Sequence, residues 1–317
     1  MHIMVVGAGS LGLLFAAKLA SQCSQLTMVT RTTEQASELA EQGIKLEGEA
    51  SQTAKSTKSI VYSSYLEETR EDIIPNERQV DYIFLMVKQT AITDELVTYL
   101  RHQMTDQTFL VCFQNGIGHE QKLSQAIAYD KLLFAVTTEG AKRNGLHSVR
   151  HTGRGITYFG VIESNKQLTP NNQHIFFVQM LKSAGFRAEL SNNMEVRIWS
   201  KLVINVVINP LTAILRVPNG DLLRSEWSRS LMQDLYEEAL KLANLKRIAL
   251  PDKLWDTILT VCEETKTNHS SMLQDIEAAR QTEIDYLNGR LVKVAEEWDL
   301  VLPTHDMVYR MIKAIEN

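Results

Sequence analysis

The sequence predicts an α/β protein in which an N-terminal dinucleotide-binding domain of the Rossmann type is followed by an all-helical C-terminal domain. In the first part of the 317-residue chain, short β-branched runs alternate with helical patterns, which is typical of a parallel sheet flanked by helices. After the cap residues Asn192 and Asn193, no further strand pattern appears, and long amphipathic helices continue to the C-terminus. We therefore expect one domain over residues 1–192 and a second, helical domain over residues 193–317.

Hydrophobic periodicity predicts the elements of the first domain in order. Buried strands are expected at residues 2–6, 26–30, 82–87, 108–112 and 132–136. Helices with apolar spacings of three and four are expected at residues 11–21, 34–42, 90–102 and 119–128. A last helix at 173–184 and a strand at 186–190 would close the domain.

Two stretches of this domain have other patterns. Glycine-punctuated alternation at residues 148–152 and 156–160 predicts two antiparallel strands that end the sheet. The polar stretch 47–79, rich in Ser, Thr and Glu, contains one expected strand at 60–62. We interpret this stretch as a surface insertion and assign it no chemistry.

Composition excludes several classes of protein. Apolar residues make up 44% and charged residues 22% of the chain, as in soluble globular proteins. A net charge of -5 argues against nucleic acid as a partner. Three cysteines without a C-x-x-C pair fit a reducing compartment, so we expect a cytoplasmic protein. The apolar stretch 4–20 lacks a basic flank, contains three glycines and is broken by Lys18, which argues against a signal peptide, and no membrane partner is expected.

A glycine-rich loop carries the prediction of a cofactor. The hexapeptide Gly7-Ala8-Gly9-Ser10-Leu11-Gly12 matches G-x-G-x-x-G, directly after an apolar strand and at the start of a helix. Glycine permits the tight turn, the approach of a pyrophosphate and close packing of helix on strand. The N–H groups and the dipole at the helix N-terminus attract the anion. In this context a dinucleotide site is favoured over a plain glycine turn.

The end of the second strand predicts which dinucleotide binds. An acidic residue there would hydrogen-bond a ribose 2′-hydroxyl, but this chain has Arg31 between Thr30 and Thr32. A guanidinium suits a phosphate dianion, so NADP(H) is favoured over NAD(H), although an exposed arginine is often only solvated. Two later loops, at Lys88 and Asn115, also follow strands, where each residue could contact the ligand or belong to a plain turn.

An apolar helical stretch contains the main catalytic candidates. Lys201, Asn205 and Asn209 are spaced by four, so they form one polar line on a helix that is otherwise buried. Burying an amide without partners costs a few kcal/mol, so the line is expected to face a cleft or to bond a second helix. A lysine in a partly dry cleft is a credible proton donor because desolvation lowers its pKa. Pro210, directly after the line, is expected to kink the helix.

A second group of polar residues lies further along the helical part. Asp275, Arg280 and Glu283 could belong to a site or to the solvated face of an amphipathic helix. His147 and His151 are four residues apart in a strand, and we favour a structural role for them over metal binding because no other ligands accompany them. No metal is therefore expected.

These motifs together resemble the ketopantoate reductase (2-dehydropantoate 2-reductase) family over nearly the whole chain. The resemblance lies in Gly7 to Gly12, Lys88, Asn115-Gly116, His151-Thr152-Gly153, Lys201 to Asn205, Asn209 to Ala213, Pro218-Asn219-Gly220, Ser270 to Asp275 and Thr282 to Gly289. The polar insertion 47–79 is the main part of the chain that does not align with the family's pattern, and no motif depends on it. The resemblance implies NADPH-dependent reduction of 2-dehydropantoate to (R)-pantoate in pantothenate and coenzyme A biosynthesis, an oxidoreductase reaction on a CH–OH group.

The resemblance also implies a role for each matching residue. Lys201 would donate the proton to the keto oxygen, and Glu283 would bind the hydroxyl end of the substrate and lie against the cofactor. The remaining substrate-binding residues would be Asn115, which also reaches the cofactor, together with Asn205, Asn209, Asn219 and Ser271. The cofactor would be bound by Gly7, Ala8, Gly9, Ser10, Leu11, Gly12, Arg31 and Lys88. Asn209 and Asn219 could instead be structural.

Two other functions fit parts of the sequence. A reductase of another 2-keto acid or an imine would use Lys201 without needing Glu283. A non-enzymatic NADPH-sensing regulator would need neither, and the buried lysine and asparagine line argues against it. A small-molecule keto acid is the expected partner, and a homodimer is compatible with the sequence.

Overall fold

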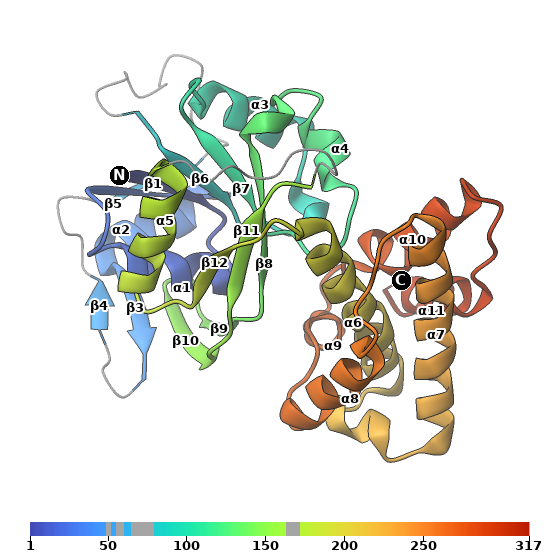
Figure 1. The fold of residues 1–317 in the computed structure, drawn as a ribbon. Coiled ribbons are helices and arrows are strands. Elements are labelled where there is room, and N and C mark those ends of the chain that lie inside the picture. Colours follow the sequence, from blue (N-terminus) through green and yellow to red (C-terminus); the bar gives the residue numbers. More distant parts are fainter. Residues whose placement is uncertain (49–51, 55–59, 65–78, 163–171, 317) are drawn as a thin grey trace. The chain divides into compact units, whose positions relative to one another are not determined.

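The computed structural model describes residues 1–48, 52–54, 60–64, 79–162 and 172–316. They form two compact units: Met1–Gln114 with His119–Met194, and Asn115–Gly118 with Glu195–Asn317. The first unit is α/β and the second is helical, which confirms the predicted fold class (Figure 1). The segment Asn115–Gly118 packs with the helical unit although its chain neighbours belong to the first, a division that periodicity does not reveal.

The main sheet of the first unit has eight strands. Their order is β12 (Ala188–Leu190), β11 (Thr157–Gly160), β8 (Leu132–Thr137), β7 (Phe109–Cys112), β6 (Tyr82–Leu85), β1 (His2–Val6), β2 (Gln25–Thr30) and β5 (Ile60–Ser64). All neighbouring pairs are parallel except β8 with β11. Every residue of β1 is buried, as expected for a strand covered on both faces. The carboxyl ends of β1, β2, β6 and β7 therefore share one edge of the sheet.

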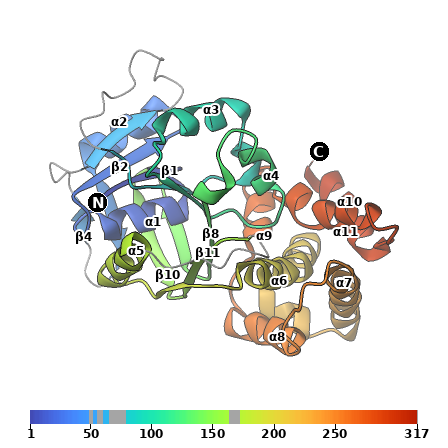
Figure 2. The same cartoon turned by 45° about the horizontal axis from the view of Figure 1, so that its top comes forward.

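Helices cover this sheet. They are α1 (Ser10–Leu19), α2 (Thr33–Gln42), α3 (Asp94–Gln103), α4 (His119–Leu123) and α5 (Asn172–Ser183), with short 3₁₀ turns η1 (Gln89–Ala91) and η2 (Tyr129–Lys131). Figure 2 shows α1 and α5 side by side, with α3 and α4 away from them. The helix expected at 90–102 is divided, because Thr93 caps α3 by accepting a hydrogen bond from Leu96 N. The helix expected at 119–128 ends at Leu123.

The prediction for residues 148–152 and 156–160 was wrong about their pairing. Only β11 joins the main sheet. Residues Ser148–Gly153 form β10, which belongs to a second sheet of order β4 (Gln52–Ala54), β3 (Ile44–Glu47), β10 and β9 (Gly140–Asn144). The polar strand β9 gave no apolar alternation, and Gly145, with φ of +69°, allows the tight turn that joins it to β10. The expected strand at 60–62 is present within β5, and residues 49–51, 55–59 and 65–78 of the polar stretch lie outside the described residues.

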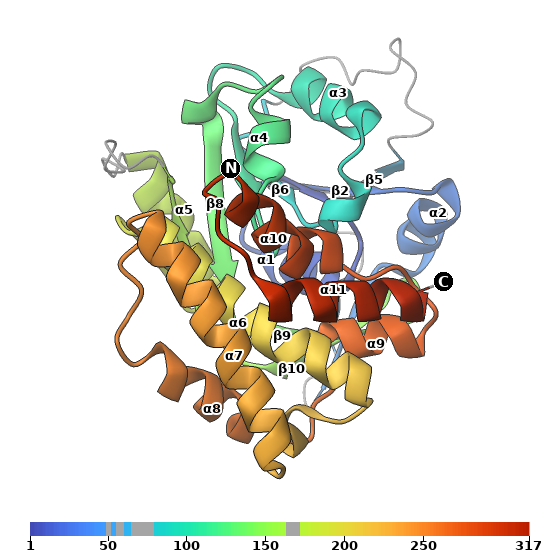
Figure 3. The same ribbon diagram turned by 90° about the vertical axis from the view of Figure 1, so that its right-hand side faces the viewer.

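The second unit is built from helices only, among the residues described. They are α6 (Met194–Leu215), η3 (Asn219–Leu223), α7 (Glu226–Leu245), α8 (Leu254–Glu264), α9 (Ser271–Glu277), η4 (Ile284–Tyr286), α10 (Asn288–Glu296) and α11 (Pro303–Glu316). Figure 3 shows α10 and α11 running beside each other. Helix α6 is long and apolar enough to cross a membrane, but 67% of its apolar window is buried inside the structure, as in the core helix of a folded unit.

Helix α6 runs through Pro210 instead of ending there. Proline has no N–H, so the carbonyl of Val206, one turn earlier, loses its helical partner. The Asn288 side chain replaces it: Nδ2 donates to Val206 O at 3.0 Å. Asn288 is fully buried and begins α10, so an amide from another helix satisfies the backbone where the proline would otherwise leave a gap.

The second hydrogen of the Asn288 amide reaches a buried histidine. His305 Nε2 donates to Leu235 O at 3.0 Å, so its Nδ1 is left as an acceptor, 3.0 Å from Asn288 Nδ2. Burial lowers the pKa of His305 to about 4, which keeps the ring neutral and preserves this arrangement. Glu238 accepts from the backbone N–H groups of Thr304 and His305, which fixes the start of α11. Helices α6, α7, α10 and α11 are thus tied together by one polar network.

We predict that Asn288→Leu lowers the free energy of unfolding by about 2–4 kcal/mol. The substitution keeps the volume but leaves Val206 O and His305 Nδ1 buried without donors. Urea unfolding measures the change. Gln233→Leu is the control, because it removes only an exposed bond to Glu237, and it should stay within about 0.5 kcal/mol of the unsubstituted protein. An unchanged urea midpoint for Asn288→Leu would show that the network does not support α6.

Candidate functional site

The three glycines of the loop between β1 and α1 have three different surroundings. Gly7 has φ of +112°, and a Cβ there would lie 2.9 Å from the backbone of Met86. A Cβ on Gly12 would lie 1.8 Å from Gly7 O, so the helix could not pack this closely with any other residue. A Cβ on Gly9 would meet nothing within 4 Å. Gly9 therefore borders open space, which is where a ligand pyrophosphate would approach the backbone.

The N-terminus of α1 has the features of an anion site. Gly9 is its N-cap and supplies no side-chain hydrogen bond to the first turn. The first N–H groups of a helix have no partner within the helix, and the helix dipole is positive at this end. The loop is fixed from the neighbouring strand, because Gly7 N donates to Val29 O at 2.8 Å. The residues present therefore fit the phosphates of a dinucleotide.

The other cofactor candidates lie at the same edge of the sheet. Arg31 directly follows β2 and has an exposed side chain, and its carbonyl accepts a hydrogen bond from Ser64 Oγ at 3.1 Å. Lys88 caps η1, just after β6. A residue that the sequence reasoning missed joins two of these loops: Gln114 Nε2 lies 2.9 Å from both Leu85 O and Val87 O. No pattern in the sequence reveals that link between β6 and β7.

The polar line on α6 is present as predicted by its spacing. Lys201 and Asn205 are half-buried and Asn209 is buried, while Leu202, Val203 and Val206 to Ile208 belong to the core of the unit. Burial lowers the pKa of the Lys201 ammonium to about 8, because desolvation disfavours the cation, and the nearby Glu283 carboxylate partly opposes this effect. Lys201 can therefore exchange a proton near neutral pH.

Glu283 and Asn115 belong to the same unit as Lys201. Glu283 is buried and precedes η4, and its Oε2 accepts a hydrogen bond from Asn115 Nδ2 at 3.4 Å. Asn115 comes from the short segment between β7 and α4, where Gly116 and Gly118 have positive φ. The structure thus brings together an ammonium, a carboxylate and an amide from three distant parts of the sequence.

The two serines before α9 have different surroundings. Ser270 is buried, and its Oγ accepts from Leu273 N at 3.1 Å and from Thr212 Oγ1 at 2.7 Å. Ser271, the residue expected to bind substrate, is exposed at the first position of α9. Thr212 Oγ1 also lies 2.9 Å from Asn209 O, so Ser270 connects α9 to the end of the polar line on α6.

Asn219 and Asp275 have partners of a structural kind. Asn219 Nδ2 donates to Thr265 Oγ1 at 2.8 Å, and its backbone N–H donates to Asn268 O at 3.0 Å, which attaches η3 to the segment after α8. Asp275 is buried and lies 3.1 Å from Arg280. The alternative that Asp275 lies on the solvated face of a helix is therefore wrong.

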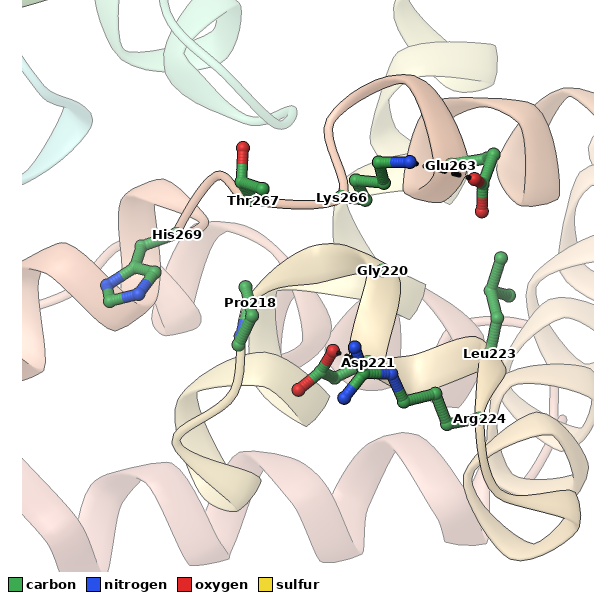
Figure 4. A pocket seen from close by; sticks show the side chains of 9 residues that line it. All are labelled: Pro218, Gly220, Asp221, Leu223, Arg224, Glu263, Lys266, Thr267 and His269. Carbon is green, nitrogen blue, oxygen red and sulfur yellow. Dashed lines mark ion pairs between the residues drawn. The ribbon is translucent and has the colours of Figure 1, made fainter.

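A cavity of about 730 Å³ lies elsewhere in the helical unit, between η3 and the segment after α8 (Figure 4). None of the residues predicted for the site lines it. Two ion pairs lie in its lining. Arg224 Nε lies 3.2 Å from Asp221 Oδ1, and Lys266 Nζ lies 3.7 Å from Glu263 Oε1. Arg224 and Lys266 thus each have a carboxylate partner within the lining of the cavity.

The two histidines considered earlier each face a carboxylate. His147 Nδ1 lies 2.9 Å from Glu38 Oε1, and His151 Nε2 lies 2.6 Å from Glu139 Oε2. Within the described ranges, no group of three or more His, Cys, Asp or Glu residues could hold a metal ion. The contacts of both histidines connect parts of the first unit.

Two family models match the chain. The model described as "Ketopantoate reductase PanE/ApbA" matches residues 3–164, and its "C terminal" counterpart matches residues 193–316. The 2-dehydropantoate 2-reductase of Bacillus subtilis is 30% identical over 319 residues, covering 100% of this chain and 98% of the relative. That of Archaeoglobus fulgidus is 29% identical over 316 residues, with the same coverage.

Solved structures have the same fold. A PanE/ApbA family ketopantoate reductase from Ralstonia eutropha has a TM-score of 0.85 at 23% identity, covering 100% of this chain and 98% of that one. D-mandelate dehydrogenase, solved with NADH and anilino(oxo)acetate, has a TM-score of 0.86 at 23% identity, with the same coverage. At these identities the likeness concerns the fold alone.

Proposed function

Because the chain belongs to the ketopantoate reductase family, we propose that it reduces the keto group of 2-dehydropantoate to give (R)-pantoate, with NADPH as the reductant. This reaction is an oxidoreductase step of pantothenate and coenzyme A biosynthesis. The observation that carries the proposal is the grouping of Lys201, Glu283 and Asn115 in one unit. It combines a proton donor with groups that can orient a polar substrate.

Lys201 acts as the general acid in this proposal. Reduction of a ketone places negative charge on the carbonyl oxygen, and a neighbouring ammonium stabilises that charge and then donates a proton. A lysine with a pKa of about 8 is largely protonated at neutral pH and releases its proton more readily than an exposed lysine. Bound NADPH would supply the hydride to the carbonyl carbon.

The remaining substrate contacts come from the same unit. Glu283 would accept a hydrogen bond from the hydroxyl end of the substrate, and Asn115 would hold this carboxylate in place, next to both ligands. Asn205, Asn209 and Ser271 would position the substrate carboxylate and hydroxyl. Asn219 acts structurally in this proposal, because its amide already donates to Thr265.

The cofactor residues belong to the first unit, except for Asn115 and Glu283. Gly7 to Gly12 would hold the pyrophosphate at the N-terminus of α1, where Gly9 leaves space for it. Arg31 would bind the 2′-phosphate of NADPH, and Lys88 would also contact the NADPH molecule. We also propose a cytosolic location, and a homodimer stays a prediction from the sequence.

A second 2-keto acid is the main alternative substrate. The same fold occurs in D-mandelate dehydrogenase, whose structure was solved with NADH and anilino(oxo)acetate. An aromatic 2-keto acid of similar shape to that compound would have no hydroxyl end for Glu283 to bind. Glu283 is therefore the residue whose role separates the two substrates.

We predict that the purified protein oxidises NADPH when ketopantoate is added, and oxidises NADH more slowly. Loss of absorbance of the reduced nicotinamide measures the rate. Pyruvate, 2-ketoisovalerate and phenylglyoxylate are the comparison substrates, and each should be reduced more slowly because it lacks the hydroxyl that Glu283 would bind. NADPH binding without any turnover of ketopantoate would contradict the proposed reaction and leave the fold unaffected.

Replacing Lys201 should affect chemistry more than cofactor binding. We predict that Lys201→Ala lowers kcat with ketopantoate by about 100-fold or more, because general acid catalysis is worth roughly 10²–10⁴-fold. The Kd for NADPH, measured by calorimetry, should change by less than about twofold, since Lys201 contacts the substrate in this proposal. Lys241→Ala, at an exposed lysine on α7, is the control and should keep full activity. Turnover within tenfold of the unsubstituted protein would remove Lys201 from the role of proton donor.

A further inference from the structure

A residue outside the predicted cofactor set contacts the glycine loop directly. Arg143 lies on β9, and its Nη1 donates to Ala8 O at 3.2 Å. Its backbone N–H also donates to Ser10 Oγ at 3.2 Å. One residue of the β9–β10 hairpin is thus bound to the loop at two points, although 133 residues separate it from Ser10.

Strand pairing fixes the direction of the Arg143 side chain. Arg143 is opposite Val149, whose side chain is fully buried in the core that contains α1. Residues paired across two strands lie on the same face of a sheet, so Arg143 lies on the face toward α1 and the loop. Lys142 is opposite Arg150, and both side chains are exposed on the other face.

A second contact shows which side of the loop Arg143 occupies. Gln35 Nε2, on α2, donates to the same Ala8 carbonyl at 3.2 Å and to Leu146 O at 3.0 Å. His147, also on the hairpin, contacts Glu38 of α2. Helix α2 begins two residues after Arg31. Arg143 therefore lies on the side of the loop that carries the end of β2, where the adenosine ribose of a dinucleotide binds in this fold.

The Arg143 guanidinium has further N–H donors that could bind a ligand at this position. Its side chain is exposed. Among the described residues, the guanidinium makes one hydrogen bond, to Ala8 O. A guanidinium carries five N–H groups in a planar fork that matches the oxygens of a phosphate. The bond to Ala8 O holds the fork at the loop without neutralising its charge.

We propose that Arg143 is a second cationic ligand of the ribose 2′-phosphate of NADPH, acting together with Arg31. The β9–β10 hairpin carries it to the loop, so that the phosphate is held between the end of β2 and the second sheet. This assignment rests on the proposed function only in its choice of dinucleotide, and it makes Arg143 a residue that discriminates NADPH from NADH.

The test is a set of binding measurements on the full-length protein. Calorimetry gives the Kd of NADPH, NADH and adenosine 2′,5′-bisphosphate for the unsubstituted protein, Arg143→Gln and Lys142→Gln. Arg143→Gln should weaken NADPH and the bisphosphate by about tenfold or more, because a charge-assisted contact to phosphate is lost, and should change the Kd of NADH by less than about twofold. Lys142→Gln removes the same charge from the other face of β9 and should leave all three within about twofold.

Two results would overturn the assignment. Equal weakening of NADPH and NADH would mean that Arg143 acts on the shared pyrophosphate or on the shape of the loop. Unchanged binding of all three ligands would mean that Arg143 only attaches the hairpin. A protein that prefers NADPH, loses this preference in Arg143→Gln and does not reduce ketopantoate would contradict the proposed reaction while supporting the role of Arg143.

Discussion

The burial of the Lys201 ammonium beside Glu283 is the constraint on which the chemistry of the helical unit depends. An ammonium is costly to remove from water, so the helix that carries it must be held by strong packing elsewhere. Helix α6 meets this need with an apolar surface, but it also contains Pro210, which frees a carbonyl in the middle of the helix. Asn288 bonds that carbonyl and the neutral ring of His305. The polar line is therefore supported by a second, fully buried polar network.

The fold was predictable from the sequence where burial is one-sided or complete. The strands of the parallel sheet are apolar runs, and the helices follow spacings of three and four. The succession of these elements along the chain could therefore be predicted. The second sheet was missed because β9 is polar and mostly exposed, and alternation in β10 does not say which strand it joins. The assignment of Asn115–Gly118 to the helical unit depends on contacts between residues far apart in the chain, which periodicity does not contain.

The candidate site was predictable to a similar extent. Spacing by four placed Lys201, Asn205 and Asn209 on one line, and the glycine loop indicated its own ligand. The resemblance named Ser271, but the structural role of its neighbour Ser270 could not be predicted, because it depends on the contact of its hydroxyl with Thr212 on another helix. Gln114 and Arg143 carry no motif, and their importance appears only when the ends of neighbouring strands and the β9–β10 hairpin are seen around the loop.

The most direct test of the central claim is titration of the Lys201 side chain itself, by NMR of protein with labelled lysine, assigned with Lys201→Arg. Burial is expected to lower its pKa to about 8, so the ammonium signal should titrate near that pH and not near the ordinary lysine value of about 10.4. The rate of turnover should fall on the alkaline limb of its pH profile at the same pH at which Lys201 loses its proton. A Lys201 that titrates near the ordinary lysine value of about 10.4 would contradict a desolvated, activated proton donor on α6.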